Sequence, residues 1–127
     1  MNETDLIQLS TSLSNATFYT IPIPNLYLTP YIICPITLGN QQYYFEYYWN
    51  NRTSLAYISI YKISNGDIKY YVKNISLKPY IFISDYIKDQ DWVGILSFEN
   101  IDNNFDISYT IKDISEKFQF LYSIPED

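Results

Sequence analysis

Apolar and polar side chains alternate with a period of two along most of this chain, and no other feature constrains its fold as strongly. From Ala16 onward, no window of about twelve residues keeps the 3.6-residue period of an amphipathic helix. The alternating segments are short and are separated by turn residues at spacings of about 8–12 residues, as in antiparallel sheets. The sequence therefore predicts an all-β fold, a small antiparallel β-sandwich or barrel with an extended N-terminal arm.

The length of 127 residues corresponds to one domain of ordinary size. Residues 1–15 are polar and weakly patterned, and they are predicted to form an arm with one helical turn across Leu6 and Ile7. Residues 16–127 are predicted to form a single β domain. Pro22 and Pro24 indicate an edge strand or an extended segment at its start, because proline lacks the N–H that a central strand donates.

The clearest prediction is a three-stranded meander over Gln42–Val72. In its first strand, alternation separates Tyr43, Phe45, Tyr47 and Trp49 from Tyr44, Glu46 and Tyr48. In its second strand, Leu55–Lys62, it separates Ala56, Ile58 and Ile60 from Leu55, Tyr57, Ser59 and Tyr61. Asn65-Gly66 predicts the hairpin turn that follows, since both central residues of a type I′ turn need a positive φ.

The other predicted elements are shorter, and they flank this meander on both sides. Before it we expect a turn at Pro24-Asn25, a strand over Tyr31–Leu38 and a turn at Gly39-Asn40. After it we expect the segments Tyr80–Ile83, Trp92–Phe98 with a bulge at Gly94, Phe105–Ile111, a helical turn over Asp113–Ser115, and a closing strand over Lys117–Ile124.

The formal net charge of −6 and the absence of histidine narrow the classes of function. A surface of this sign repels phosphate groups, which disfavours nucleic acid and anionic membranes as partners. A chain without histidine cannot use Ser-His-Asp or Cys-His catalysis, and it lacks the usual ligand of zinc and haem. We therefore expect no cofactor, no metal ion and no enzymatic activity.

Cys34, the single cysteine, lies in an apolar segment and is interpreted as a small buried side chain. Glu3 and Asp5 stand where a secretory signal carries positive charge. The longest apolar run, Tyr31–Leu38, is too short to span a membrane. These features predict a soluble chain without a signal peptide.

Acidic side chains supply the enzymatic alternative. A glycosidase needs two carboxyl groups about 5 to 9.5 Å apart, and the candidates are Asp85, Asp89, Asp91, Glu99, Asp102 and Asp106. Nothing in the sequence predicts the raised pKa that a general acid requires. Asp89-Gln90-Asp91 matches a calcium loop poorly, because the next ligand position is Val93, so a solvated acidic turn is the preferred interpretation.

Aromatic residues are unusually frequent, with 15 Tyr, 7 Phe and 2 Trp. One small core cannot bury all of them, and Tyr and Trp are enriched at protein interfaces. We predict a partner interface that contains Tyr43, Tyr44, Tyr48, Trp49, Asn50, Arg52, Tyr57 and Tyr61. Two alternatives remain: Tyr43, Tyr47, Tyr57 and Tyr61 are cross-strand pairs within the sheet, or exposed tyrosines make the chain a module that recognises carbohydrate or protein.

The central meander also carries a resemblance to a known family. Its residues are Leu38-Gly39, Asn50-Asn51-Arg52, the aromatic strand Tyr57–Tyr61, Asn65-Gly66 and Leu77. With the segment Ile21–Asn25 and the closing strand Phe118–Tyr122, this arrangement resembles the baseplate plug proteins of contractile-tailed phages.

That resemblance implies a small all-β virion protein at the centre of a phage or phage-like tail baseplate, assembled in the host cytoplasm. Its implied partners are the hub, spike and tail-tube proteins, together with further copies of itself in a symmetric ring or plug. Asn50 and Arg52 either fix their hairpin and bind a neighbouring chain, or they only shape the turn.

Overall fold

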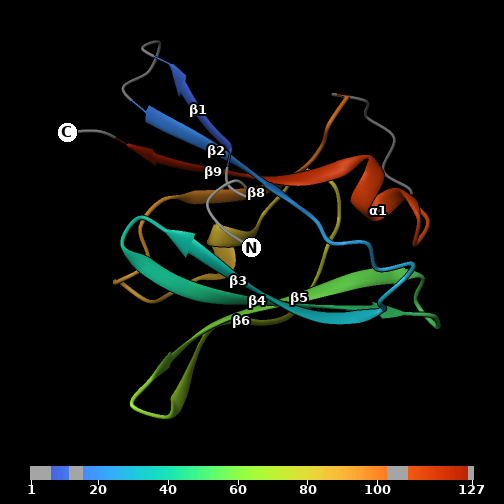
Figure 1. Ribbon diagram of the computed structural model, residues 1–127, viewed down its shortest axis with the longest axis horizontal. Helices are drawn as coiled ribbons and strands as arrows, with labels where there is room; N and C mark the ends of the chain where they lie inside the picture. Colours follow the sequence, from blue (N-terminus) through green and yellow to red (C-terminus); the bar gives the residue numbers. More distant parts are fainter. Residues whose placement is uncertain (1–6, 12–15, 103–108, 126–127) are drawn as a thin grey trace.

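Two antiparallel sheets pack face to face in the computed structural model, which describes residues 7–11, 16–102 and 109–125 (Figure 1). One sheet has the strand order β1-β2-β9-β8-β7 and the other has the order β3-β4-β5-β6. This arrangement confirms the predicted all-β class and selects the sandwich. The strands are β1 (Ile7–Thr11), β2 (Ala16–Pro22), β3 (Tyr31–Leu38), β4 (Gln41–Asn50), β5 (Leu55–Ser64), β6 (Asp67–Ser76), β7 (Ile81–Phe82), β8 (Ile95–Asn100) and β9 (Phe118–Pro125).

The chain crosses between the two sheets twice. Residues 23–30 lead from β2 to β3, and residues 77–80 lead from β6 to β7. In the first crossing the Asn25 side chain accepts hydrogen bonds from the backbone N–H groups of Tyr27 and Leu28, which forms the predicted turn. β9 then lies between β2 and β8, so the last strand joins the beginning of the chain to its final third.

The predicted meander is confirmed as β4, β5 and β6, which are joined by antiparallel pairing. Asn65 and Gly66 have φ values of 54° and 83°, as the type I′ turn requires. β6 is irregular beside β5, where the register shifts on both sides of Ile60. These bulges turn both Tyr71 and Val72 toward the core.

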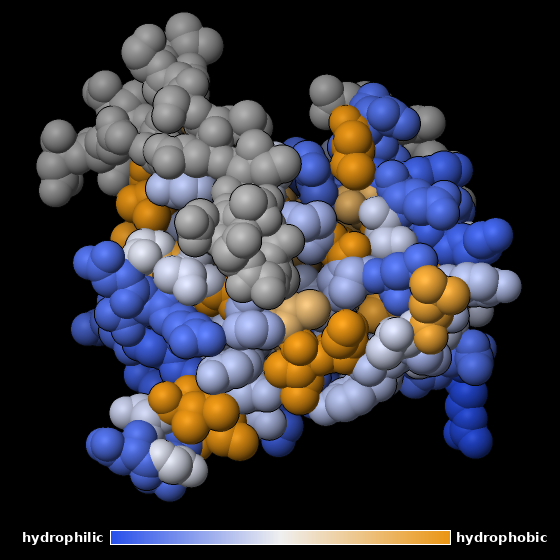
Figure 2. Space-filling model, in the orientation of Figure 1, coloured by the Kyte–Doolittle hydropathy of each residue, from blue (hydrophilic) through white to orange (hydrophobic). Residues whose placement is uncertain are grey.

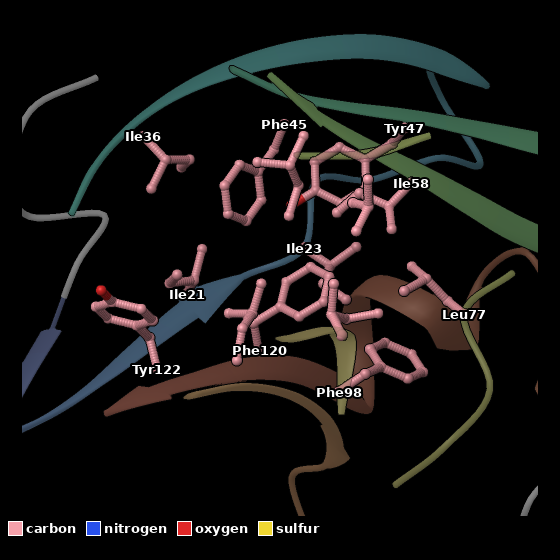
Figure 3. Close-up of a cluster of buried hydrophobic side chains, with 14 of the residues drawn as sticks. Ile21, Ile23, Ile36, Phe45, Tyr47, Ile58, Leu77, Phe98, Phe120 and Tyr122 are labelled. Atoms are coloured by element: carbon pink, nitrogen blue, oxygen red, sulfur yellow. The ribbon is translucent and has the colours of Figure 1, made fainter. Parts of the chain in front are cut away.

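Aromatic and branched side chains from both sheets form one core (Figure 3). Phe45 and Tyr47 of β4 meet Phe120 of β9, with ring centroids 5.8 and 6.3 Å apart. Phe98 of β8 stacks on Phe118 at 5.1 Å. Because these residues sit at alternate positions of their strands, the opposite face of each strand points away from the core.

The structure corrects several predicted boundaries. Ile7 lies in β1 and not in a helical turn, and Leu6 lies outside the described residues. β2 lies between β1 and β9 and is not an edge strand of the sheet, but Pro22 itself lies past the end of the pairing with β1 and pairs on one side, with Gln119 of β9. β8 begins at Ile95, after Gly94 has bent the chain at a φ of +103°. Of the predicted strand Phe105–Ile111, residues 105–108 lie outside the described part and residues 109–111 are not in a strand.

Two short helices complete the described chain. The predicted helical turn is confirmed as α1 (Asp113–Glu116), where Thr110 and Asp113 exchange two hydrogen bonds of 3.2 Å. Of the predicted segment Tyr80–Ile83, Ile81–Phe82 form β7, and the last residue, Ile83, begins a 3-10 helix, η2 (Ile83–Tyr86). Within the described ranges, no helix has the length and apolar character needed to cross a membrane.

Candidate functional site: a tyrosine face

Six tyrosines lie on the face of the β3-β4-β5-β6 sheet that points away from the core. We call this set the tyrosine face, and it consists of Tyr31, Tyr44, Tyr48, Tyr57, Tyr61 and Tyr70. Alternation explains its position, since Phe45 and Tyr47 enter the core from β4 while Tyr44 and Tyr48 point the other way.

Strand register arranges the tyrosine face in two rows that run across the sheet. Tyr48 pairs with Tyr31 of β3 on one side and with Tyr57 of β5 on the other. In the second row, Tyr61 pairs with Tyr44 of β4 and with Tyr70 of β6. The rows are four positions apart along β4, a spacing of about 13 Å at the usual rise of a strand.

Within each row, the neighbouring rings from β4, β5 and β6 pack against one another. The Tyr44 and Tyr61 rings are 5.5 Å apart with an interplanar angle of 19°, and the Tyr48 and Tyr57 rings are 5.1 Å apart at 14°. Tyr61, between Tyr44 and Tyr70, is only 7% exposed although it is not part of the core cluster. The rows are therefore ordered by their own contacts, at a benefit of about 0.5–1.5 kcal/mol per ring pair.

A polar row lies between the two tyrosine rows. Glu46 is its central residue and pairs with Ile33 of β3 and with Ser59 of β5. Tyr31 donates a hydrogen bond from its hydroxyl to a carboxylate oxygen of Glu46. This bond to the carboxylate raises the pKa of Tyr31 to about 12, because ionisation of the tyrosine would place two negative charges side by side. Ser59 continues the row by accepting the backbone N–H of Asn74 at 2.9 Å.

The β5–β6 hairpin extends the tyrosine face beyond the sandwich. In Figure 1 this hairpin projects away from the body of the molecule, and Figure 2 shows hydrophobic residues over it. Ile63 and Ile68 pair across the hairpin and are both about half exposed. Exposed apolar residues at such a site are typical of a surface that contacts another molecule.

Tyr43 and Trp49, which the sequence assigned to the interface, lie on the core side of β4 instead. Tyr43 is 4% exposed and packs against Tyr71 and Trp92 at 5.5 and 5.1 Å. Trp49 is half-buried beside Tyr109, and its indole N–H donates to Asn51. The odd-numbered positions of β4 face the opposite sheet, so these two residues do not belong to the tyrosine face.

Tyr44, Tyr48, Tyr57 and Tyr61 are the predicted interface residues that the structure does bring together. The alternative that Tyr43, Tyr47, Tyr57 and Tyr61 form cross-strand pairs is confirmed for Tyr57 and Tyr61, whose partners are Tyr48 and Tyr44. It is wrong for Tyr43 and Tyr47, which pair with Ile36 and Ile58 and belong to the core. Asn50 shapes the β4–β5 turn through hydrogen bonds from the backbone N–H groups of Arg52 and Thr53. Arg52 is exposed within that turn.

Sequence reasoning missed three contributors, namely Tyr31, Tyr70 and the central position of Glu46. Tyr31 belongs to β3 and Tyr70 to β6, so their place depends on how those strands are registered against the meander. Counting residues outward from the Asn65-Gly66 turn would have identified Tyr70. Ser64 pairs with Asp67 across this turn, so Tyr61 pairs with Tyr70. The predicted turn at Gly39-Asn40 sets the register of β3 in the same way, because Leu38 pairs with Gln41 across it and Tyr31 therefore pairs with Tyr48.

Three acidic candidates of the enzymatic alternative, Asp89, Asp91 and Glu99, have structural contacts. Asp91 accepts a hydrogen bond from the Tyr71 hydroxyl at 2.8 Å and lies 3.1 Å from the Lys69 ammonium. Both contacts lower the pKa of Asp91, the opposite of what a general acid needs. Asp89 also contacts Lys69, Glu99 accepts a hydrogen bond from Ser97, and Asp106 lies outside the described residues. In the described ranges, no group of three or more acidic or cysteine side chains is arranged to hold a metal ion.

Comparisons of the chain with models of protein families, with curated proteins and with solved structures find no match. The case for a function therefore depends on the tyrosine face itself.

Proposed function

We propose that this chain is a non-enzymatic structural component of a contractile phage or phage-like tail baseplate, and that its tyrosine face packs against a neighbouring protein. The observation that carries the proposal is the tyrosine face, whose two rows cover four strands and continue onto the hairpin. Tyrosine is favoured at such contacts because it supplies a large, stiff ring and a hydroxyl that remains hydrated.

The baseplate itself, with the hub, spike and tail-tube proteins as partners, comes from the resemblance of the meander residues to plug proteins. The acidic charge is compatible with that location, because a negative surface in a tail lumen repels passing DNA. In this proposal the chain is assembled in the host cytoplasm and becomes part of the virion.

Ring packing favours a protein partner over a carbohydrate. Sugars stack on the flat faces of aromatic rings, but Tyr44 and Tyr61 turn their ring faces toward each other, as do Tyr48 and Tyr57. A protein surface can instead contact the ring edges and hydroxyl groups that remain accessible.

Mass spectrometry of purified tail particles tests the proposal. After prophage induction in the source strain, we expect the chain at a low, fixed ratio to the tube and spike proteins. A chain that is abundant in the lysate but absent from intact particles contradicts the baseplate role and favours the binding module.

A pair of variants tests the surface. Tyr31→Ser with Tyr70→Ser removes the two most exposed rings of the tyrosine face, at 54% and 39% exposure. Tyr27→Ser with Tyr86→Ser is the matched control, because these tyrosines are 54% and 49% exposed and lie elsewhere. We expect the first pair to reduce incorporation into particles and the control pair to leave it unchanged; equal incorporation of both contradicts the role of this face.

A further inference from the structure

Glu46 places a negative charge at the centre of an otherwise aromatic surface. Its strand, β4, lies inside the sheet, and its neighbours across the register are Ile33 and Ser59, neither of which is cationic. The ion pairs formed among the described residues join Lys69 and Lys117 to aspartates and do not include Glu46. The Tyr31 hydroxyl orients the carboxylate without neutralising it.

Aromatic rings beside this carboxylate favour a cationic ligand. Lys73 already shows this on the same sheet, where its ammonium lies 4.9 Å from the Tyr70 ring centroid. A guanidinium suits the central position better than an ammonium, because it binds a carboxylate with two parallel hydrogen bonds.

Charge also favours a different protein, and not a second copy of this chain, as the molecule that binds the tyrosine face. Two identical tyrosine faces packed across a twofold axis would bring two Glu46 carboxylates toward each other in a desolvated interface, which is strongly unfavourable. The net charge of −6 adds repulsion between copies and attracts a basic surface.

We infer that the tyrosine face docks an arginine-bearing segment of a partner protein, with the guanidinium paired to Glu46 between the two tyrosine rows. The inference rests on the proposed function, because it names the chemistry of the protein that this face contacts. Self-association within a baseplate then uses other surfaces of the chain.

Titration with short peptides tests the inference on the whole purified chain. The probes are hexa-arginine, hexalysine and an uncharged hexaserine, followed by NMR of backbone amides at low and moderate salt. We expect hexa-arginine to shift amides around Glu46, Tyr48 and Ser59, to bind more tightly than hexalysine, and to weaken as salt rises. Hexaserine is expected to cause no shifts.

Two variants with the same change in net charge make the test specific. Glu46→Gln keeps the shape of the side chain and is expected to weaken hexa-arginine binding about tenfold, the loss of one charge-assisted contact. Glu116→Gln removes an exposed charge from α1 and is expected to change the affinity less than about twofold.

Several outcomes overturn the inference. They are equal effects of the two variants, peptide shifts that cluster away from the tyrosine face, or a concentration-dependent dimer whose interface shifts map to Glu46. Saturable shifts on this face with a neutral oligosaccharide, and none with hexa-arginine, also contradict it. If Glu46→Gln chains still enter tail particles normally, the arginine site fails while the baseplate role stands; if the wild-type chain is absent from particles, the baseplate role fails.

Discussion

At the scale of single residues, Tyr47 is the largest of the fully buried side chains, and its polar hydroxyl is buried with it. Its ring packs beside those of Phe45 and Phe120 and is fully buried (Figure 3). Its hydroxyl has no hydrogen-bond partner among the described residues. Burial raises the pKa of Tyr47 well above its ordinary value, because the charged form has no access to water. A buried hydroxyl without a partner costs about 1–3 kcal/mol.

We therefore expect Tyr47→Phe to increase the free energy of unfolding by about 1 kcal/mol, since it removes the unpaired hydroxyl and keeps the ring. Tyr109→Phe is the matched control, because the Tyr109 hydroxyl accepts the Ala56 N–H at 3.1 Å and donates to the Leu77 carbonyl. That control is expected to lose about 1–3 kcal/mol. Urea unfolding measures both changes, and a loss of stability in Tyr47→Phe would contradict this account of its hydroxyl.

At the scale of elements, Gly94 determines where β8 begins. Its φ of +103° disfavours any residue with a side chain. A Cβ atom here would lie 2.7 Å from the Tyr122 ring and 2.8 Å from the Ser123 carbonyl oxygen. The Tyr122 hydroxyl also donates to the Val93 carbonyl, so the bend is held against β9 on both sides of the glycine.

Gly94→Ala is accordingly expected to destabilise the fold by about 3 kcal/mol, the combined cost of a steric clash and an unfavourable φ. Gly66→Ala measures the cost of the unfavourable φ alone, since the φ of Gly66 is +83° and nothing lies within 4 Å of the added methyl group. The control should lose about 1 kcal/mol. Chemical denaturation of the two variants measures the difference, and equal losses would mean that the contact with Tyr122 relaxes freely.

The same scale shows what the sequence could predict. Alternation and Asn65-Gly66 are local signals, and they sufficed for the meander and for placing Tyr44 with Tyr48, and Tyr57 with Tyr61, on one face of their strands. Trp92 was placed in a strand because it is apolar, but it packs across Tyr43 and Tyr71 before the strand begins. The insertion of β9 between β2 and β8 depends on contacts between distant segments that no local pattern encodes.

At the scale of the whole molecule, the tyrosines link stability to alkaline pH. Burial raises the pKa of Tyr109 and of Tyr122 to about 12, compared with 10 in an unfolded chain. Each native side chain therefore keeps its proton at pH values where the unfolded chain has lost it. Their contribution to stability is complete below pH 10 and disappears as the pH rises from 10 through 12.

We expect the free energy of unfolding to fall above pH 10, by at most about 1.4 kcal/mol per pH unit for each of these two tyrosines. Tyrosinate absorbance should show the rings of Tyr109 and Tyr122 ionising only when near-ultraviolet circular dichroism is lost. Tyr109→Phe removes one of the two groups, so its stability should decline less steeply with pH than that of the wild type, although it starts lower. Tyr86→Phe, which changes an exposed ring, should keep the wild-type slope. A flat stability between pH 10 and 11, or the same slope in Tyr109→Phe as in the wild type, would contradict the link between these core hydroxyls and folding.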